Sequence, residues 1–93
     1  MATQEQLEAK ALGALAALSK IDGKERELSP TLAFGQDYNK LLGQITELRP
    51  NLKDVLPPQV SLHAQQKVTE ALFIEMHAYY QQVLNLLLAA RKA

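Results

Sequence analysis

Apolar residues recur along most of this chain at spacings of three and four, the period of an amphipathic α-helix. Alternating apolar and polar runs of the kind that form strands are absent, while Ala, Leu, Gln, Glu and Lys dominate. The pattern predicts an all-α fold, a three-helix bundle with a long C-terminal amphipathic helix and a short helical turn in the second connector. We expect residues 1–93 to form a single helical domain.

The first predicted helix covers about residues 4–20. Thr3 precedes Gln6 by three positions, which predicts a capping box in which each side chain bonds the other residue's amide. The apolar face contains small residues, so a neighbouring helix can approach closely; its members are Leu7, Ala11, Ala14, Leu18 and Ile21. Ala9, Gly13 and Ala17 form a second row of small residues on this helix.

The second predicted helix covers about residues 30–49 and ends before Pro50. Ser29 and Pro30 have the form of an N-cap followed by a proline in the first turn, and Gly35 leaves open a later start. The charged residues 22–28 that precede it are expected to form a solvated loop. Residues 51–56 are expected to form the short helical turn.

The third predicted helix covers about residues 61–91, because Ser61 can cap it and no Gly or Pro follows Pro58. Such a helix would be about 45 Å long. Its apolar arc, about 160° wide, exceeds the arc of about 100° that one neighbouring helix covers. We therefore expect an interface formed by Phe73, Met76, Tyr80, Val83, Leu84 and Leu87 of this arc, together with Ile74 and Leu88, which lie outside the arc on the otherwise polar side.

Charge and composition narrow the possible partners. Ten basic and ten acidic residues cancel, which argues against nucleic-acid binding, and the absence of cysteine removes disulfides and cysteine-ligated zinc. No run of about 18 apolar residues predicts a membrane span. The polar, acidic start is unlike a signal peptide, so we expect no membrane association and a cytoplasmic location.

Candidate chemistry is sparse. His63, Glu70 and His77 share one stripe of the expected helix, but seven residues rise about 10 Å, too far for two of them to ligate one ion. A site built on them would need ligands from another chain. No phosphate-binding loop, nucleophile motif or metal-ligand spacing occurs elsewhere. The sequence therefore predicts no catalytic residue, no metal ligand and no cofactor, and the protein is expected not to be an enzyme.

These observations favour a small helical protein–protein interaction module that self-associates through its C-terminal helix as a homodimer. Three alternatives stay open. The first is a nucleic-acid-associated regulator that acts as a dimer. The second is an accessory, antitoxin or immunity-type partner of another protein. The third is a small enzyme or metal protein with an inter-subunit site on His63, Glu70 and His77.

Overall fold

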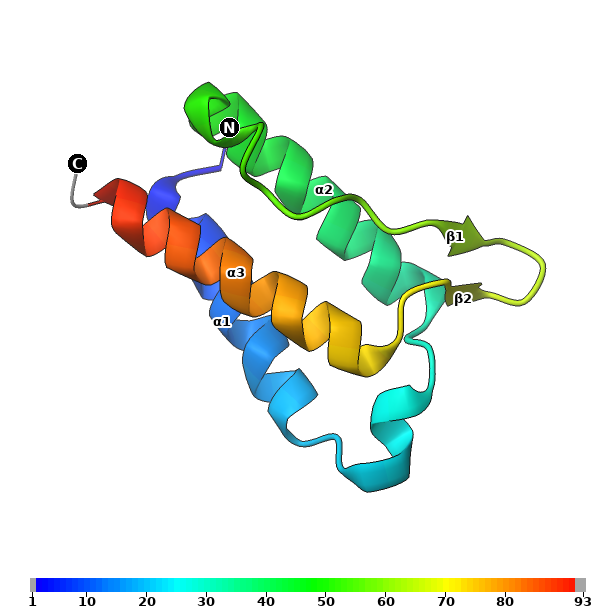
Figure 1. Cartoon of the computed structure of the whole chain (residues 1–93). Coiled ribbons are helices and arrows are strands. Elements are labelled where there is room, and N and C mark those ends of the chain that lie inside the picture. Colours follow the sequence, from blue (N-terminus) through cyan, green and yellow to red (C-terminus); the bar gives the residue numbers. More distant parts are fainter. Residues whose placement is uncertain (1, 92–93) are drawn as a thin grey trace.

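The computed structural model describes residues 2–91, and most of them are helical (Figure 1). Two short 3₁₀-helices and a two-stranded antiparallel sheet connect the α-helices. The elements in chain order are α1 (Gln4–Ser19), η1 (Gly23–Glu27), α2 (Leu32–Leu48), η2 (Pro50–Leu52), β1 (Leu62–His63), β2 (Val68–Thr69) and α3 (Phe73–Arg91). The all-α prediction is thus confirmed in its broad form.

Helix α1 begins at the expected capping box, which is confirmed. Thr3 Oγ1 accepts a hydrogen bond from the Gln6 backbone N–H at 3.2 Å, and Gln6 Oε1 accepts one from the Thr3 N–H at 3.0 Å. Both partners lie within one helical turn, so local sequence alone specifies this end.

Helix α2 begins two residues later than expected, and Thr31 rather than Ser29 caps it. Thr31 Oγ1 accepts from the Phe34 N–H at 3.3 Å. The prediction of Ser29 as the cap is wrong because the chain just before the helix is extended and paired with a distant segment. The Pro30 carbonyl accepts a hydrogen bond from the Thr69 N–H at 3.0 Å.

The predicted helix from Ser61 to Arg91 is wrong over residues 61–72. Strands β1 and β2 pair there, with Leu62 opposite Thr69 and His63 opposite Val68, and α3 begins only at Phe73. The turn between the strands holds Lys67 at a φ of 58°, which ends any helix. The backbone hydrogen bonds that a helix would form here are replaced by bonds between the two strands and by bonds to the chain before α2. Helix α3 therefore has 19 residues and no long projecting arm.

Helices α1 and α3 run antiparallel in close contact, and α2 runs in roughly the same direction as α3 (Figure 1). The core is formed by one face of each helix: Leu7, Ala11, Leu15 and Leu18 from α1, Tyr38, Leu41, Leu42 and Ile45 from α2, and Met76, Tyr80, Val83, Leu84 and Leu87 from α3. Each buried aliphatic side chain of this size stabilises the fold by about 1.5–3 kcal/mol.

Aromatic rings fill the space between α2 and α3. The Tyr38 ring stacks on Tyr79 with centroids 6.0 Å apart and meets Tyr80 edge to face at 5.2 Å. Phe34 also meets Tyr80 edge to face, at 5.8 Å. The bulk of these rings, together with the small residues on α1, leaves a space between α2 and part of α1.

Candidate functional site: the outer face of α1 and its groove

The residues predicted to form an α3 interface are mostly internal. Met76, Tyr80, Val83, Leu84 and Leu87 are buried in the chain's own core. They could meet a partner only if that core opened. The apolar arc that suggested a surplus is covered by α1 and α2, because α3 is much shorter than expected.

Three members of that predicted interface lie outside the buried set. Phe73 is partly buried at the start of α3. Ile74 is 52% exposed and Leu88 is 39% exposed, at opposite ends of the helix. Two separated side chains make a much smaller apolar surface than the sequence pattern predicts.

The predicted stripe of His63, Glu70 and His77 is broken up by the hairpin. His63 Nε2 lies 3.0 Å from Glu70 Oε1, and both side chains are about half exposed. His77 lies instead on α3, beside a small notch next to Ile74 and Leu18. Within residues 2–91, no group of three or more His, Cys, Asp or Glu side chains could hold a metal ion. An exposed pair such as His63–Glu70 contributes about 0–1 kcal/mol.

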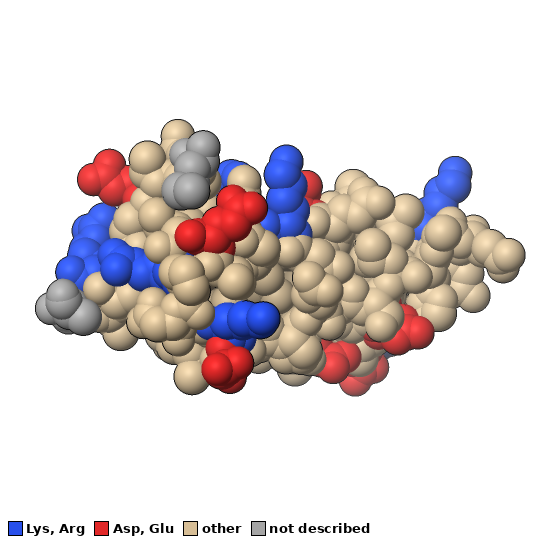
Figure 2. Space-filling view, turned by 90° about the horizontal axis from the view of Figure 1, so that it is seen from above, with Lys and Arg blue, Asp and Glu red and all other residues tan. Residues whose placement is uncertain are grey.

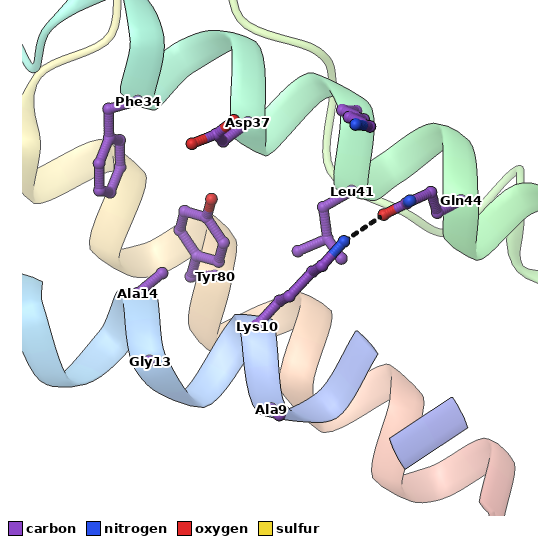
Figure 3. A pocket seen from close by; sticks show the side chains of 10 residues that line it. Ala9, Lys10, Gly13, Ala14, Phe34, Asp37, Leu41, Gln44 and Tyr80 are labelled. Carbon is purple, nitrogen blue, oxygen red and sulfur yellow. Dashed lines mark hydrogen bonds between the residues drawn. The ribbon is translucent and has the colours of Figure 1, made fainter. Parts of the chain in front are cut away.

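A groove of about 420 Å³ lies between α1 and α2, with Tyr80 of α3 at its base (Figure 3). Three of the four α1 residues that line it, Ala9, Gly13 and Ala14, are small and leave this space open. The residues that line it are Ala9, Lys10, Gly13, Ala14, Phe34, Asp37, Lys40, Leu41, Gln44 and Tyr80. The row of small residues on α1 is visible in the sequence, but the position of α2 beside it is not.

Polar groups face this groove from both walls. Lys10 Nζ reaches across from α1 and donates a hydrogen bond to Gln44 Oε1 at 3.0 Å (Figure 3). Tyr80 is only 4% exposed, yet its hydroxyl points into the groove, on the side where Asp37 lies. Burial, and after it the negative charge of Asp37, raises the pKa of Tyr80 to about 12. The Tyr80 hydroxyl keeps its proton at neutral pH and can donate a hydrogen bond into the groove.

The outer face of α1 adjoins the groove and shares Ala9 and Gly13 with it. Its residues are all exposed: Glu5, Ala9, Leu12, Gly13, Ala16 and Lys20. Leu12 is 54% exposed at the middle of the helix. Apart from its two chain neighbours and the backbone of its own helix, no atom of residues 2–91 lies within 4 Å of where a Cβ on Gly13 would be, so contacts with other elements do not require a glycine there.

Charged side chains are scattered over the face drawn in Figure 2. Lys and Arg gather mainly at the left-hand end of that view, Asp and Glu form a group at the lower right and separate spots elsewhere, and most of the face is uncharged. The described part of this face shows no continuous basic stripe of the kind that follows a phosphate backbone.

No family model matches the chain, and no curated protein and no solved structure matches it. None of the helices in residues 2–91 is long and apolar enough to cross a membrane.

Proposed function

We propose that this protein is a small helical protein–protein interaction module that forms a homodimer through the outer face of α1. The two copies of α1 lie antiparallel about a two-fold axis that passes between Leu12 and Gly13. The observation that carries this proposal is the self-complementary order of residues along that face.

An antiparallel pairing about this axis sets each residue opposite a suitable partner. Glu5 lies opposite the partner's Lys20, Ala9 opposite the partner's Ala16, and Leu12 opposite the partner's Gly13. At 3.6 residues per turn, the six positions fall within an arc of about 100°, as wide as one helix contact needs. A two-fold interface uses the same patch on both subunits, so every pairing occurs twice.

Shape and charge favour this orientation over a parallel one. The side chain of Leu12 would project into the open space beside the partner's Gly13, and the alanines would let the helix axes approach to about 8 Å. A parallel pair would instead place Glu5 beside the partner's Glu5 and Lys20 beside the partner's Lys20. Like charges at both ends would then oppose association.

Gly13 gives independent support. A glycine in a helix interior lowers stability by about 0.5–1 kcal/mol relative to alanine. No neighbour in residues 2–91 occupies the space of its missing side chain. Contact with a second copy would give the glycine a structural role.

The size of this surface limits the expected affinity. Helix α1 has 16 residues and is about 24 Å long. One such helix pair buries less than the roughly 800 Å² per partner of a standard interface. We therefore expect a dissociation constant in the micromolar range or weaker, and the dimer must be sought at high protein concentration.

Sedimentation velocity across a concentration series, from low micromolar to near millimolar, tests the proposal. Wild type should shift from the mass of one chain toward that of two, and Leu12→Glu should stay at one chain throughout. Ile74→Glu is the matched control, because Ile74 is about as exposed as Leu12 but lies on α3. Circular dichroism checks that both variants keep the wild-type helix content.

A Leu12→Glu variant that associates as strongly as wild type would overturn the proposal. Loss of the dimer in Ile74→Glu alone would also overturn it and would return the interface to α3. A wild-type chain that remains monomeric over the whole series would reject self-association itself.

A further inference from the structure

The groove between α1 and α2 has the size and character of a small-ligand site. Its volume of about 420 Å³ lies within the range of roughly 300–1,000 Å³ that ligand pockets occupy. All of its lining residues belong to one chain, and two of them, Ala9 and Gly13, also belong to the proposed dimer face. Apolar groups, among them Ala14, Phe34 and Leu41, make up much of its wall.

One end of the groove is rich in positive charge. Lys10 on α1 and Lys40 on α2 both line it, with the Gln44 amide close by. Among residues 2–91 the ion pairs are His63–Glu70 and Glu8–Arg91, so neither groove lysine has an acidic partner there. An anionic group at this end could replace the Gln44 oxygen as the acceptor for Lys10.

The other end holds a hydrogen-bond donor beside an acceptor. The Tyr80 hydroxyl points into the groove, and no hydrogen bond joins it to another residue that lines the groove (Figure 3). Asp37 lies on the opposite wall, and its carboxylate faces the same space (Figure 3). A ligand hydroxyl could accept a hydrogen bond from Tyr80 and donate one to Asp37.

Asp37 also sets the charge that the site can accept. A second negative charge on the ligand would be repelled by this carboxylate, whereas one negative charge can stay at the lysine end. Along α2, the axial rise from Asp37 is about 5 Å to Lys40 and about 10 Å to Gln44. The charged end and the hydroxyl of a fitting ligand would be separated by a similar length.

We infer that this groove binds a small organic monocarboxylate whose apolar, preferably aromatic, body carries a hydroxyl at the far end. The carboxylate lies between Lys10 and Lys40, the body lies against Phe34 and Leu41, and the hydroxyl lies between Tyr80 and Asp37.

The test is a titration of isotope-labelled wild-type protein, followed by amide chemical shifts, with para-hydroxyphenylpropionate as the probe. A ligand of this size binds weakly, so millimolar concentrations are needed. We expect saturable shifts confined to the groove. The uncharged para-hydroxyphenylpropionamide should bind at least about threefold more weakly, as the loss of a half-exposed charge pair predicts.

Substitutions assign the two ends of the site. Lys40→Gln should weaken binding of the probe about three- to fivefold. Asp37→Asn should not weaken the contact between the carboxylate of the probe and the two lysines. Lys53→Gln is the control, because Lys53 is an exposed lysine outside the groove. Tyr80→Phe keeps the buried ring, so it should weaken the hydroxylated probe while leaving phenylpropionate binding unchanged.

Equal binding of the carboxylate and the carboxamide would overturn the inference, as would shifts that spread over the whole surface without saturation. Equal weakening of both acids by Tyr80→Phe would show that the hydroxyl has no part in binding. A Lys40→Gln effect no larger than that of Lys53→Gln would remove the lysine end.

Discussion

Gly35 and Thr69 are packed so closely that the Thr69 methyl group occupies the space of a Cβ on Gly35. Leu62 Cδ2 lies 2.8 Å from the same position. Residues from both strands of the hairpin thus pack against Gly35, one of the two glycines of α2. Thr69 is 1% exposed, and its Oγ1 donates to the Ala71 carbonyl at 2.8 Å, so the hairpin is fixed from both sides.

Gly35→Ala should therefore destabilise the protein by about 1–3 kcal/mol, the usual penalty for forcing extra atoms into a packed contact. Gly43→Ala is a matched control, because Gly43 lies in the same helix with no neighbour within 4 Å of its missing Cβ. That change should stabilise by about 0.5–1 kcal/mol through helix propensity. Urea unfolding of both variants measures the difference; midpoints that move in the same direction would contradict the contact.

Lys67 offers a test of the turn between the strands. Its φ of 58° disfavours a side chain and suits glycine. Lys67→Gly should raise the free energy of unfolding by up to about 1 kcal/mol, since relief of strain exceeds the greater freedom of the unfolded chain. The β-branched Lys67→Val should lower it. Thermal unfolding would refute this account if both variants melted at the same temperature.

The charges at the two ends of α1 test the proposed dimer independently of its apolar centre. Glu5→Lys alone and Lys20→Glu alone should each weaken the dimer about tenfold, because two symmetry-related attractions become repulsions. The double variant should recover affinity close to wild type. Sedimentation at low and moderate salt would show the recovery and its screening. A double variant weaker than either single one would exclude the antiparallel pairing.

Alkaline pH should destabilise the fold through the buried tyrosines. The pKa of Tyr80 is raised from about 10 to about 12 by burial and by Asp37, so the folded state keeps this proton after the unfolded chain has lost it. Its stabilising contribution is therefore complete below about pH 10 and is lost progressively as the pH rises toward 12.

Melting temperatures measured across that interval should fall more steeply for wild type than for Tyr80→Phe. Some dependence should remain in the variant, because burial, with the neighbouring Tyr79 and Tyr80, also raises the pKa of Tyr38. Identical slopes for the two proteins would show that the Tyr80 hydroxyl is not shielded from solvent.

Local sequence determined that the chain is mainly helical and how α1 begins. The spacing of apolar residues predicts most of the core face of α1, with Leu7, Ala11 and Leu18, and the capping box of Thr3 and Gln6 needs only residues one turn apart. The small residues on α1 are likewise visible in the sequence. Each of these features depends on interactions within a few positions, so the printed sequence contains the needed information.

Only the tertiary structure decided what residues 61–72 become. Their composition permits a helix, and the competing hydrogen bonds come from the chain before α2, about forty residues earlier, as when the Pro30 carbonyl binds the Thr69 N–H. The same pairing placed the N-cap of α2 at Thr31 rather than Ser29, and it made α3 shorter than expected. In the shorter α3, most residues of the predicted interface are covered by α1 and α2. The outer face of α1 stays uncovered, and a groove lies between α1 and α2. Contacts between distant segments decide such outcomes, because local propensities for helix and strand differ by less than these contacts contribute.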